Sequence, residues 1–318
     1  MKFIKPKIFE DAACTAIKNP VIKILVFILV FSVASSAQSL IPTIMAFPYI
    51  MKYTSELTDT PTIEQALSIT MKAISEQPVM LANLFCTVLT TIIVILFCKF
   101  LEKRPLSSMG FVKSHAGRDY LVGMGVGLLM FSAVVGVNLL FGAITFDGVN
   151  TNLNIGIILL FFVGYLLQGM SEEVVFRGYL MTDIGGTHST VLAVFISSLA
   201  FGLVHLVNSG VTVLSVVNIV LIGAFLAIYM ICFENIWGVC AIHSLWNFSQ
   251  GHVFGISVSG MAESESLLLT SPVESRTLIN GGSFGAEGGL GTTIVVVVSL
   301  AVLILYMIKK KKIVFNMK

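Results

Sequence analysis

The chain has 318 residues, of which 56% are hydrophobic and only 11% are charged. Soluble domains carry roughly 25% charged residues, so this composition excludes nearly every class of water-soluble protein. The 19 Lys and Arg residues against 17 Asp and Glu residues leave a net charge of only +2, which provides no basic surface for nucleic acid. The five cysteines form no Cys-x-x-Cys pair, so neither a disulfide framework nor a thiolate zinc site is indicated.

Long apolar runs recur along the whole sequence. A helix crosses the hydrocarbon core of a bilayer with roughly 20 apolar residues, because lipid offers no partner to free backbone groups. The runs are continuous and do not alternate with polar residues, so they predict helices and not a β-barrel. We therefore predict an all-α, polytopic membrane bundle of about eight spans embedded in the lipid bilayer. The expected spans are 21–44, 79–99, 120–143, 157–182, 189–207, 211–232, 236–256 and 292–308.

Basic residues gather in alternate connections. Lys and Arg are frequent before the first span, in 99–118 and in 309–312, whereas the connections 45–78, 144–156 and 257–291 are mainly acidic. Since basic connections remain in the cytoplasm, both termini are predicted to be cytoplasmic. The first run has a basic leader and small residues that resemble a signal-peptide cleavage site, but its long apolar core favours a retained span.

We expect one membrane domain over 1–318 and no separate soluble catalytic domain. Residues 257–291 are rich in Gly and acidic residues, so they are expected to form a flexible outer loop. No internal repeat is visible, which argues against an inverted-repeat transporter. The expected divisions are the N-terminal spans with their basic connection in 1–120, a core in 121–256, the outer loop in 257–291, and the last span with its basic tail in 292–318.

The fourth span carries three charged residues, Glu172, Glu173 and Arg177. Charged side chains inside a membrane are unfavourable unless they are paired or face a cavity, so each is a candidate for function. Glu173 and Arg177 are four residues apart and are predicted to pair on one helical face. That pair alone is also compatible with a purely structural role. Glu172 lies about 100° round the helix and has no local partner, which makes it the candidate general base.

Two later spans each carry a histidine that lies one helical turn from a second candidate residue. Phe201 and His205 share a face of the fifth span, as do His243 and Asn247 on the seventh. Phe201 is expected to pack around the site. His252 lies about 180° round the helix from His243, so we expect it to face elsewhere.

Glu172, His205, His243 and Asn247 are all predicted to lie at membrane depth, over a spread of about 15 Å. If they converge, a carboxylate and an imidazole can deprotonate water, while a second imidazole and an amide donate hydrogen bonds to an oxyanion. Glu172, His205 and His243 are equally suited to hold zinc or another divalent ion with an open water position. The sequence leaves the metal-dependent and metal-free alternatives open.

The order Glu-Glu-x-x-x-Arg, Phe-x-x-x-His and His-x-x-x-Asn on three apolar spans resembles the CPBP intramembrane protease family, also called Abi. The resemblance covers about 172–247, and Arg104 to Phe111 also resembles the family's connection before the third span. This family includes type II C-a-a-X prenyl endopeptidases and proteins of bacteriocin processing or immunity. The resemblance implies that 121–256 is the catalytic core.

The resemblance also implies roles for individual residues. They are water activation by Glu172 and His205, support of the first helix by Glu173 and Arg177, and stabilisation of the oxyanion by His243 and Asn247.

Two functions follow from these observations. The first is an intramembrane endopeptidase that hydrolyses a membrane-associated or lipidated peptide. The second is a non-hydrolytic membrane protein, either a bacteriocin self-immunity factor or a proton-coupled transporter, that uses the same buried polar groups. Other intramembrane proteases fit less well, because the sequence has no His-Glu-x-x-His motif, no pair of deep Asp residues and no Gly-x-Ser-x-Gly motif with a histidine in the right order. The substrate, and whether it is prenylated, is left open.

Overall fold

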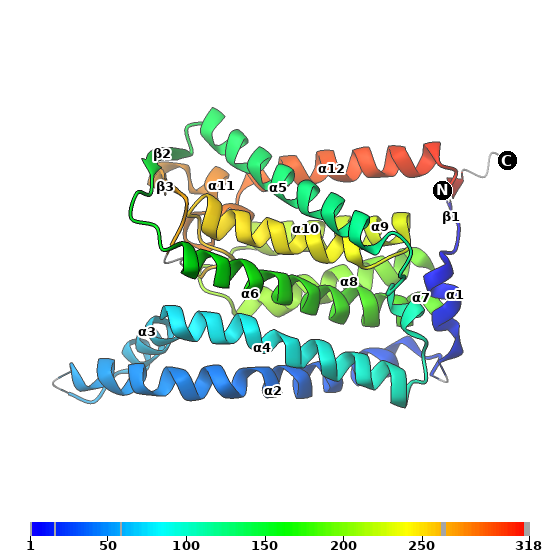
Figure 1. Cartoon of the computed structure of the whole chain (residues 1–318), viewed down its shortest axis with the longest axis horizontal. Coiled ribbons are helices and arrows are strands. Elements are labelled where there is room, and N and C mark those ends of the chain that lie inside the picture. Colours follow the sequence, from blue (N-terminus) through cyan, green and yellow to red (C-terminus); the bar gives the residue numbers. More distant parts are fainter. Residues whose placement is uncertain (1, 16, 58, 262–264, 315–318) are drawn as a thin grey trace.

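The computed structural model describes residues 2–15, 17–57, 59–261 and 265–314. Its long helices run roughly side by side, and the two ends of the chain lie at the same end of the bundle (Figure 1). In the described part, seven helices are long and apolar enough to cross a membrane, so the predicted all-α polytopic fold is confirmed. The main helices are α2 (Pro20–Ser55), α4 (Gln77–Leu96), α5 (Ala116–Leu140), α6 (Ile155–Glu173), α8 (Thr190–Val204), α9 (Val213–Phe233), α10 (Trp237–Phe248) and α12 (Leu290–Lys309). Of these eight, α10 has 12 residues and is not among the seven, although a span was predicted there.

Shorter elements complete the bundle at its two ends. Three long helices continue as π-helical turns: α4 through Phe97–Leu101, α6 through Val174–Met181 and α10 through Ser249–Val253. The short helices are α1 (Lys7–Asp11), α3 (Ile63–Ile74), α7 (Thr182–Thr187) and α11 (Thr277–Asn280). Strand β1 (Lys2–Phe3) pairs with β4 (Ile313–Val314), and β2 (Ile144–Val149) pairs with β3 (Leu268–Pro272), both antiparallel.

The helix expected at 236–256 is enclosed by its neighbours. After Trp237, every residue of α10 is buried, and the helix packs against both α5 and α6. Gly123 and Gly127 on α5 permit the close approach, since a side chain at either would strike a carbonyl oxygen of α10. Small residues four apart are a recurrent device for close helix packing in membranes. The buried face of α10 is thus held firmly in the centre of the bundle.

The structure adds detail to the expectations for two connections. The first helix does not end near 44 but runs for 36 residues to Ser55, roughly 54 Å at the usual rise per residue, and it projects together with α3 beyond the other helices (Figure 1). The stretch 257–291, expected to be a flexible loop, contains β3, α11 and several 3₁₀ turns. Several of its glycines have positive φ angles that close tight turns, as at Gly281 and Gly285.

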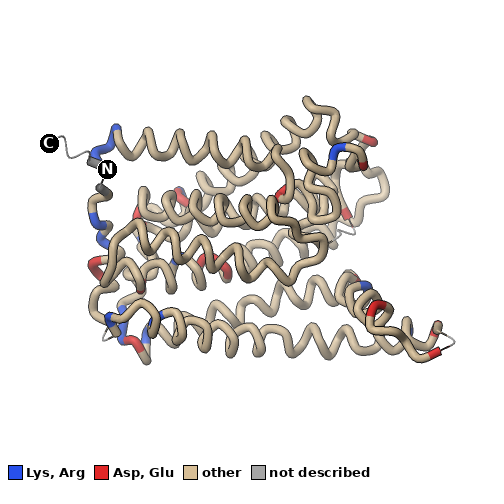
Figure 2. The backbone as a smooth tube through the Cα atoms, turned by 180° about the vertical axis from the view of Figure 1, so that it is seen from behind, with Lys and Arg blue, Asp and Glu red and all other residues tan. Residues whose placement is uncertain are grey.

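The charge distribution separates the two ends of the bundle. Most Lys and Arg residues gather at the end that holds both termini, and acidic residues are prominent at the opposite end (Figure 2). The predicted placement of both termini on one side is therefore confirmed. The positive-inside rule assigns that side to the cytoplasm, and we call it the inner end and the opposite side the outer end.

The inner end of the fourth span is buried on all sides. Every residue from Glu173 to Gly186 is buried. The buried ammonium of Lys23 lies 2.5 Å from an oxygen of Asp183, and the buried guanidinium of Arg104 donates to the hydroxyl of Thr182. These pairs join α2 and the basic connection after α4 to the end of the fourth span.

The Lys23–Asp183 pair gives a first prediction. Replacing Asp183 with Ala leaves a buried ammonium without its carboxylate, so we expect the free energy of unfolding to fall by about 3–5 kcal/mol. The double variant Lys23→Met/Asp183→Leu removes both charges and is expected to recover most of this loss. Unfolding in one detergent, followed by circular dichroism, measures both. The exposed Asp59→Ala serves as control, and a loss at Asp183 no larger than the control's contradicts the prediction.

Candidate active site

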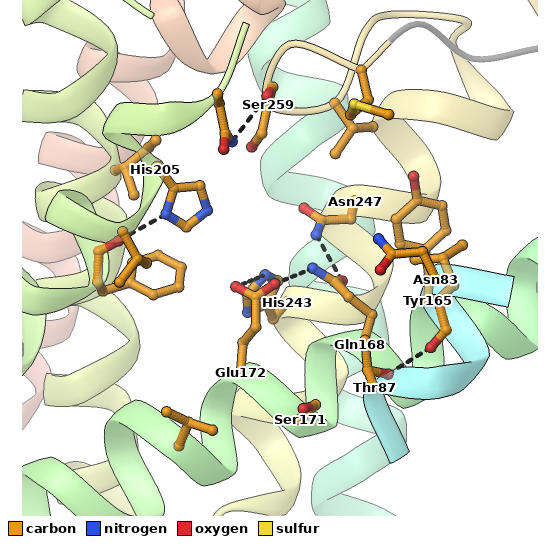
Figure 3. A pocket seen from close by; sticks show the side chains of 18 of the residues that line it. Asn83, Thr87, Tyr165, Gln168, Ser171, Glu172, His205, His243, Asn247 and Ser259 are labelled. Atoms are coloured by element: carbon orange, nitrogen blue, oxygen red, sulfur yellow. Dashed lines mark hydrogen bonds and ion pairs between the residues drawn. The ribbon is translucent and has the colours of Figure 1, made fainter. Parts of the chain in front are cut away.

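A cavity of about 580 Å³ lies between the α2–α4 pair and the helices α6, α8, α9 and α10. Glu172, His205, His243 and Asn247 all line it, and their side chains face this common space (Figure 3). The spread in depth expected from the sequence therefore does not separate them. α8 ends just before His205, and all four residues reach the same cavity.

Glu172 has one occupied and one free carboxylate oxygen. Oε1 accepts a hydrogen bond from the amide of Gln168. Oε2 is buried without a hydrogen-bond partner and lies 3.8 Å from Nε2 of His243. Because an unpaired buried oxygen is unfavourable, this atom is the natural acceptor for a water molecule or a substrate N–H in the cavity.

Gln168 is a partner of Glu172 that the sequence did not predict, since Glu172 was expected to have no local partner. Its amide nitrogen donates to Glu172, and its amide oxygen accepts a hydrogen bond of 3.0 Å from Nδ2 of Asn247. The signal was present in the sequence as a spacing of four residues before Glu172, which places both side chains on one helical face. Gln168 thus links the candidate base to the candidate oxyanion donor.

Glu173 and Arg177 form the predicted pair, with 2.8 Å between their charged groups and both side chains fully buried. The same Glu173 oxygen lies 2.7 Å from Nδ1 of His243. Arg177 also donates to the carbonyl of Gly223 on α9 and lies 4.3 Å from the centre of the Phe201 ring. These contacts tie four helices together around one buried carboxylate.

The ring nitrogens of the two histidines have distinct surroundings. With Nδ1 of His243 bound to Glu173, its Nε2 is left facing Glu172 and the cavity. In His205, Nδ1 lies 2.8 Å from the carbonyl oxygen of Phe201 and can only donate to it, so in a neutral ring Nε2 is an acceptor. The Phe201 ring meets both imidazoles edge-on, with centroids 5.0 Å from His205 and 5.8 Å from His243.

His252 lies away from the cavity, whereas Glu287 lines it. His252 stacks on Phe161 with ring centroids 4.1 Å apart and is not among the residues described as lining the cavity, as expected. Glu287, from the outer stretch, does line the cavity and accepts hydrogen bonds from Trp246 and Ser259. Glu287 was not predicted as a site residue, because its Gly-rich surroundings indicated a flexible loop.

The donor groups do not form a ready-made metal site. Among the residues that the structure describes, no three His, Cys, Asp or Glu side chains are grouped so that they could hold a metal ion. Glu172 and His243 face each other, but Nδ1 of His243 is already bound to Glu173. Zinc or another divalent ion at Glu172, His205 and His243 would therefore require rearrangement of these side chains.

The fold and the cavity define a polytopic helical membrane protein with carboxylate, imidazole and amide groups converging at membrane depth. Residues 154–249 match the family model for type II CAAX prenyl endopeptidase Rce1-like proteins, which confirms the resemblance to the CPBP family. No curated protein matches the chain. At the level of the family, the match supports a CAAX-type intramembrane protease, and it spans the helices that carry Glu172, His205 and His243.

The arrangement of donors predicts the metal content of the purified protein. We expect zinc and other divalent metals to be substoichiometric after purification without chelators, because no preformed set of three ligands is available to bind them tightly. Elemental analysis by mass spectrometry measures this directly. One equivalent of metal that is lost in the His243→Ala variant contradicts the prediction.

Proposed function

We propose that the chain is an intramembrane endopeptidase that hydrolyses a peptide bond in a membrane-associated peptide without a metal ion. The observation that carries this proposal is the unpaired, buried Oε2 of Glu172 beside Nε2 of His243 on the wall of a cavity. A carboxylate with a free oxygen at membrane depth can hold and deprotonate water where lipid would exclude it.

In the proposed reaction, Glu172 takes a proton from water as the water oxygen bonds to the carbonyl carbon of the substrate. Gln168 occupies Oε1 of Glu172 and leaves Oε2, which lies beside Nε2 of His243, to accept the proton. His205 acts from the opposite wall (Figure 3), where its Nε2 accepts a hydrogen bond from the same water. Such general-base catalysis typically contributes about 10²–10⁴-fold to a rate.

The negative charge that develops on the carbonyl oxygen needs hydrogen-bond donors. Asn247 uses one N–H for Gln168 and has a second to offer. His243 offers Nε2–H when its ring is protonated, with Nδ1–H held by Glu173. The proton gained by Glu172 then passes to the leaving nitrogen as the C–N bond breaks, which restores the carboxylate.

Substitution of the candidate base tests the proposal. We expect Glu172→Gln to lower the rate of cleavage of a membrane-peptide library by about 10²–10⁴-fold, because the amide cannot take up the proton. His205→Ala is expected to lower it by at least about tenfold for the loss of the second acceptor. Mass spectrometry of the products in detergent solution measures both rates.

The matched controls for these variants are Glu274→Gln and His188→Ala. Glu274 is exposed on the outer stretch and His188 lies at the inner end, and neither lines the cavity. Both controls are expected to cleave at the rate of the native chain. Cleavage by folded Glu172→Gln at the native rate overturns the proposal and favours the non-hydrolytic alternative.

Gln168 is expected to act by positioning and not by proton transfer. Gln168→Met keeps the length of the side chain but removes both hydrogen bonds, so Glu172 and Asn247 lose their common support. We expect kcat to fall by roughly 10–100-fold with little change in KM, since a small misplacement of catalytic groups has an effect of this size. Steady-state kinetics with one cleaved peptide measures the two constants. A change confined to KM contradicts the positioning role.

A further inference from the structure

The cavity extends from the middle of the bundle toward the outer end. Its lining includes residues at the outer ends of several helices, where α3 ends, α4 begins and α8 ends. The residues of this outer portion are Met71, Ile74, Val79, Val207, Asn208, Ser209, Val258, Ser259, Met261 and Glu287. The outer stretch therefore forms one wall of the cavity, where the side-chain amide of Asn208 donates to the carbonyl of Ser259 at 3.0 Å.

The exposed part of the lining is also at the outer end. Ser39 and Thr43 on α2, Asn83 on α4 and Ser209 after α8 line the cavity and are exposed. Hydroxyl and amide groups of this kind keep an opening hydrated, whereas the surrounding helix surfaces are apolar. The mouth of the cavity thus lies between the outer half of α2 and the turn that follows α8.

The inner limit of the cavity is closed. Its innermost lining includes the rings of Phe176 and Phe225, both almost fully buried. Beyond them lies the end of the fourth span, buried on every side, with Phe9 of α1 packed against Gly185. Among the described residues, none from the inner connections 102–115, 182–189 or 234–236 lines the cavity.

We propose that the cavity receives its substrate from the outer side of the membrane, opposite both termini, and that the substrate is a peptide segment anchored in the outer half of the bilayer. This inference rests on the proposed function and adds the side and the class of substrate. It follows from the polar mouth at the outer end and the packed inner end.

The depth of Glu172 sets a requirement on the substrate. Glu172 lies 17 residues after the start of α6 at Ile155, which corresponds to about 25 Å of helix. An extended chain covers this distance with roughly eight residues. A substrate that enters from the level of the outer end of α6 must therefore offer an unwound segment of about this length before the bond that is cut.

The charge of the cavity indicates the composition of that segment. Its described lining contains Glu172 and Glu287 but no Lys or Arg. A free carboxylate at the substrate's C-terminus would find no Lys or Arg to bind and would meet two acidic groups. We therefore expect cleavage within an uncharged segment and not next to a C-terminal carboxylate.

Cysteine labelling tests the side of access without any assay of activity. Cys14 is exposed near the inner end, whereas the other native cysteines are buried, so Cys14 is a built-in reference. In intact cells that produce the Ser209→Cys variant, a membrane-impermeant maleimide is expected to label residue 209, and Cys14 is expected to react only after permeabilisation. Labelling of both from one side, labelling of residue 209 only from inside, or no labelling of residue 209 overturns the proposal.

A second measurement tests whether substrate uses this mouth. In detergent, attachment of a bulky maleimide to the Ser209→Cys variant is expected to slow cleavage at least tenfold relative to the same protein unlabelled. In the native chain, the same reagent on Cys14 is expected to have no effect. Unchanged cleavage after labelling at residue 209 refutes passage through the mouth. Absence of cleavage by every unlabelled protein refutes the proposed function instead, and the labelling in cells still decides the side of access.

Discussion

The packing of the central helices depends on the groups that pair with the buried carboxylate of Glu173. In a bundle surrounded by lipid, an ionised side chain without partners is strongly unfavourable, so Glu173 needs a cation and hydrogen-bond donors from within the protein. Arg177 supplies the charge from one turn along the same chain, and His243 supplies a donor from α10. Arg177 also contacts α9 and the Phe201 ring on α8. The residues that pair with Glu173 therefore also hold the central helices in position.

The same pairing gives the adjacent residues Glu172 and Glu173 different roles. Glu173 is fully enclosed and orients His243, while Glu172 keeps a free oxygen at the wall of the cavity. Gln168 then fixes the orientation of Glu172 and Asn247 through a single amide group. One stretch of the fourth span therefore contains both the structural core of the site and its candidate reactive group, and π-helical turns begin directly after Glu173. Such turns are frequent at functional sites.

The sequence predicted the features that depend on one helix and missed those that depend on two. The spans, the Glu173–Arg177 pair and the shared face of Phe201 and His205 follow from apolar length and from the helical repeat. The contact between Glu173 and His243 joins residues 70 positions apart, and it depends on the rotation and tilt of two helices, which periodicity does not fix. Glu287 was missed for a related reason, because Gly-rich composition does not reveal that turns will fold back onto the bundle.

The pairing of β1 with β4 links the order of synthesis to the closure of the inner end. β4 follows α12, so β1 cannot pair with it until α12 has been translated. The amino-terminal segment that β1 precedes packs over the end of the fourth span, where Lys5 donates to the carbonyl of Gly186. During biogenesis the helices that carry the candidate site are therefore made before the β1–β4 pair can form at the inner end.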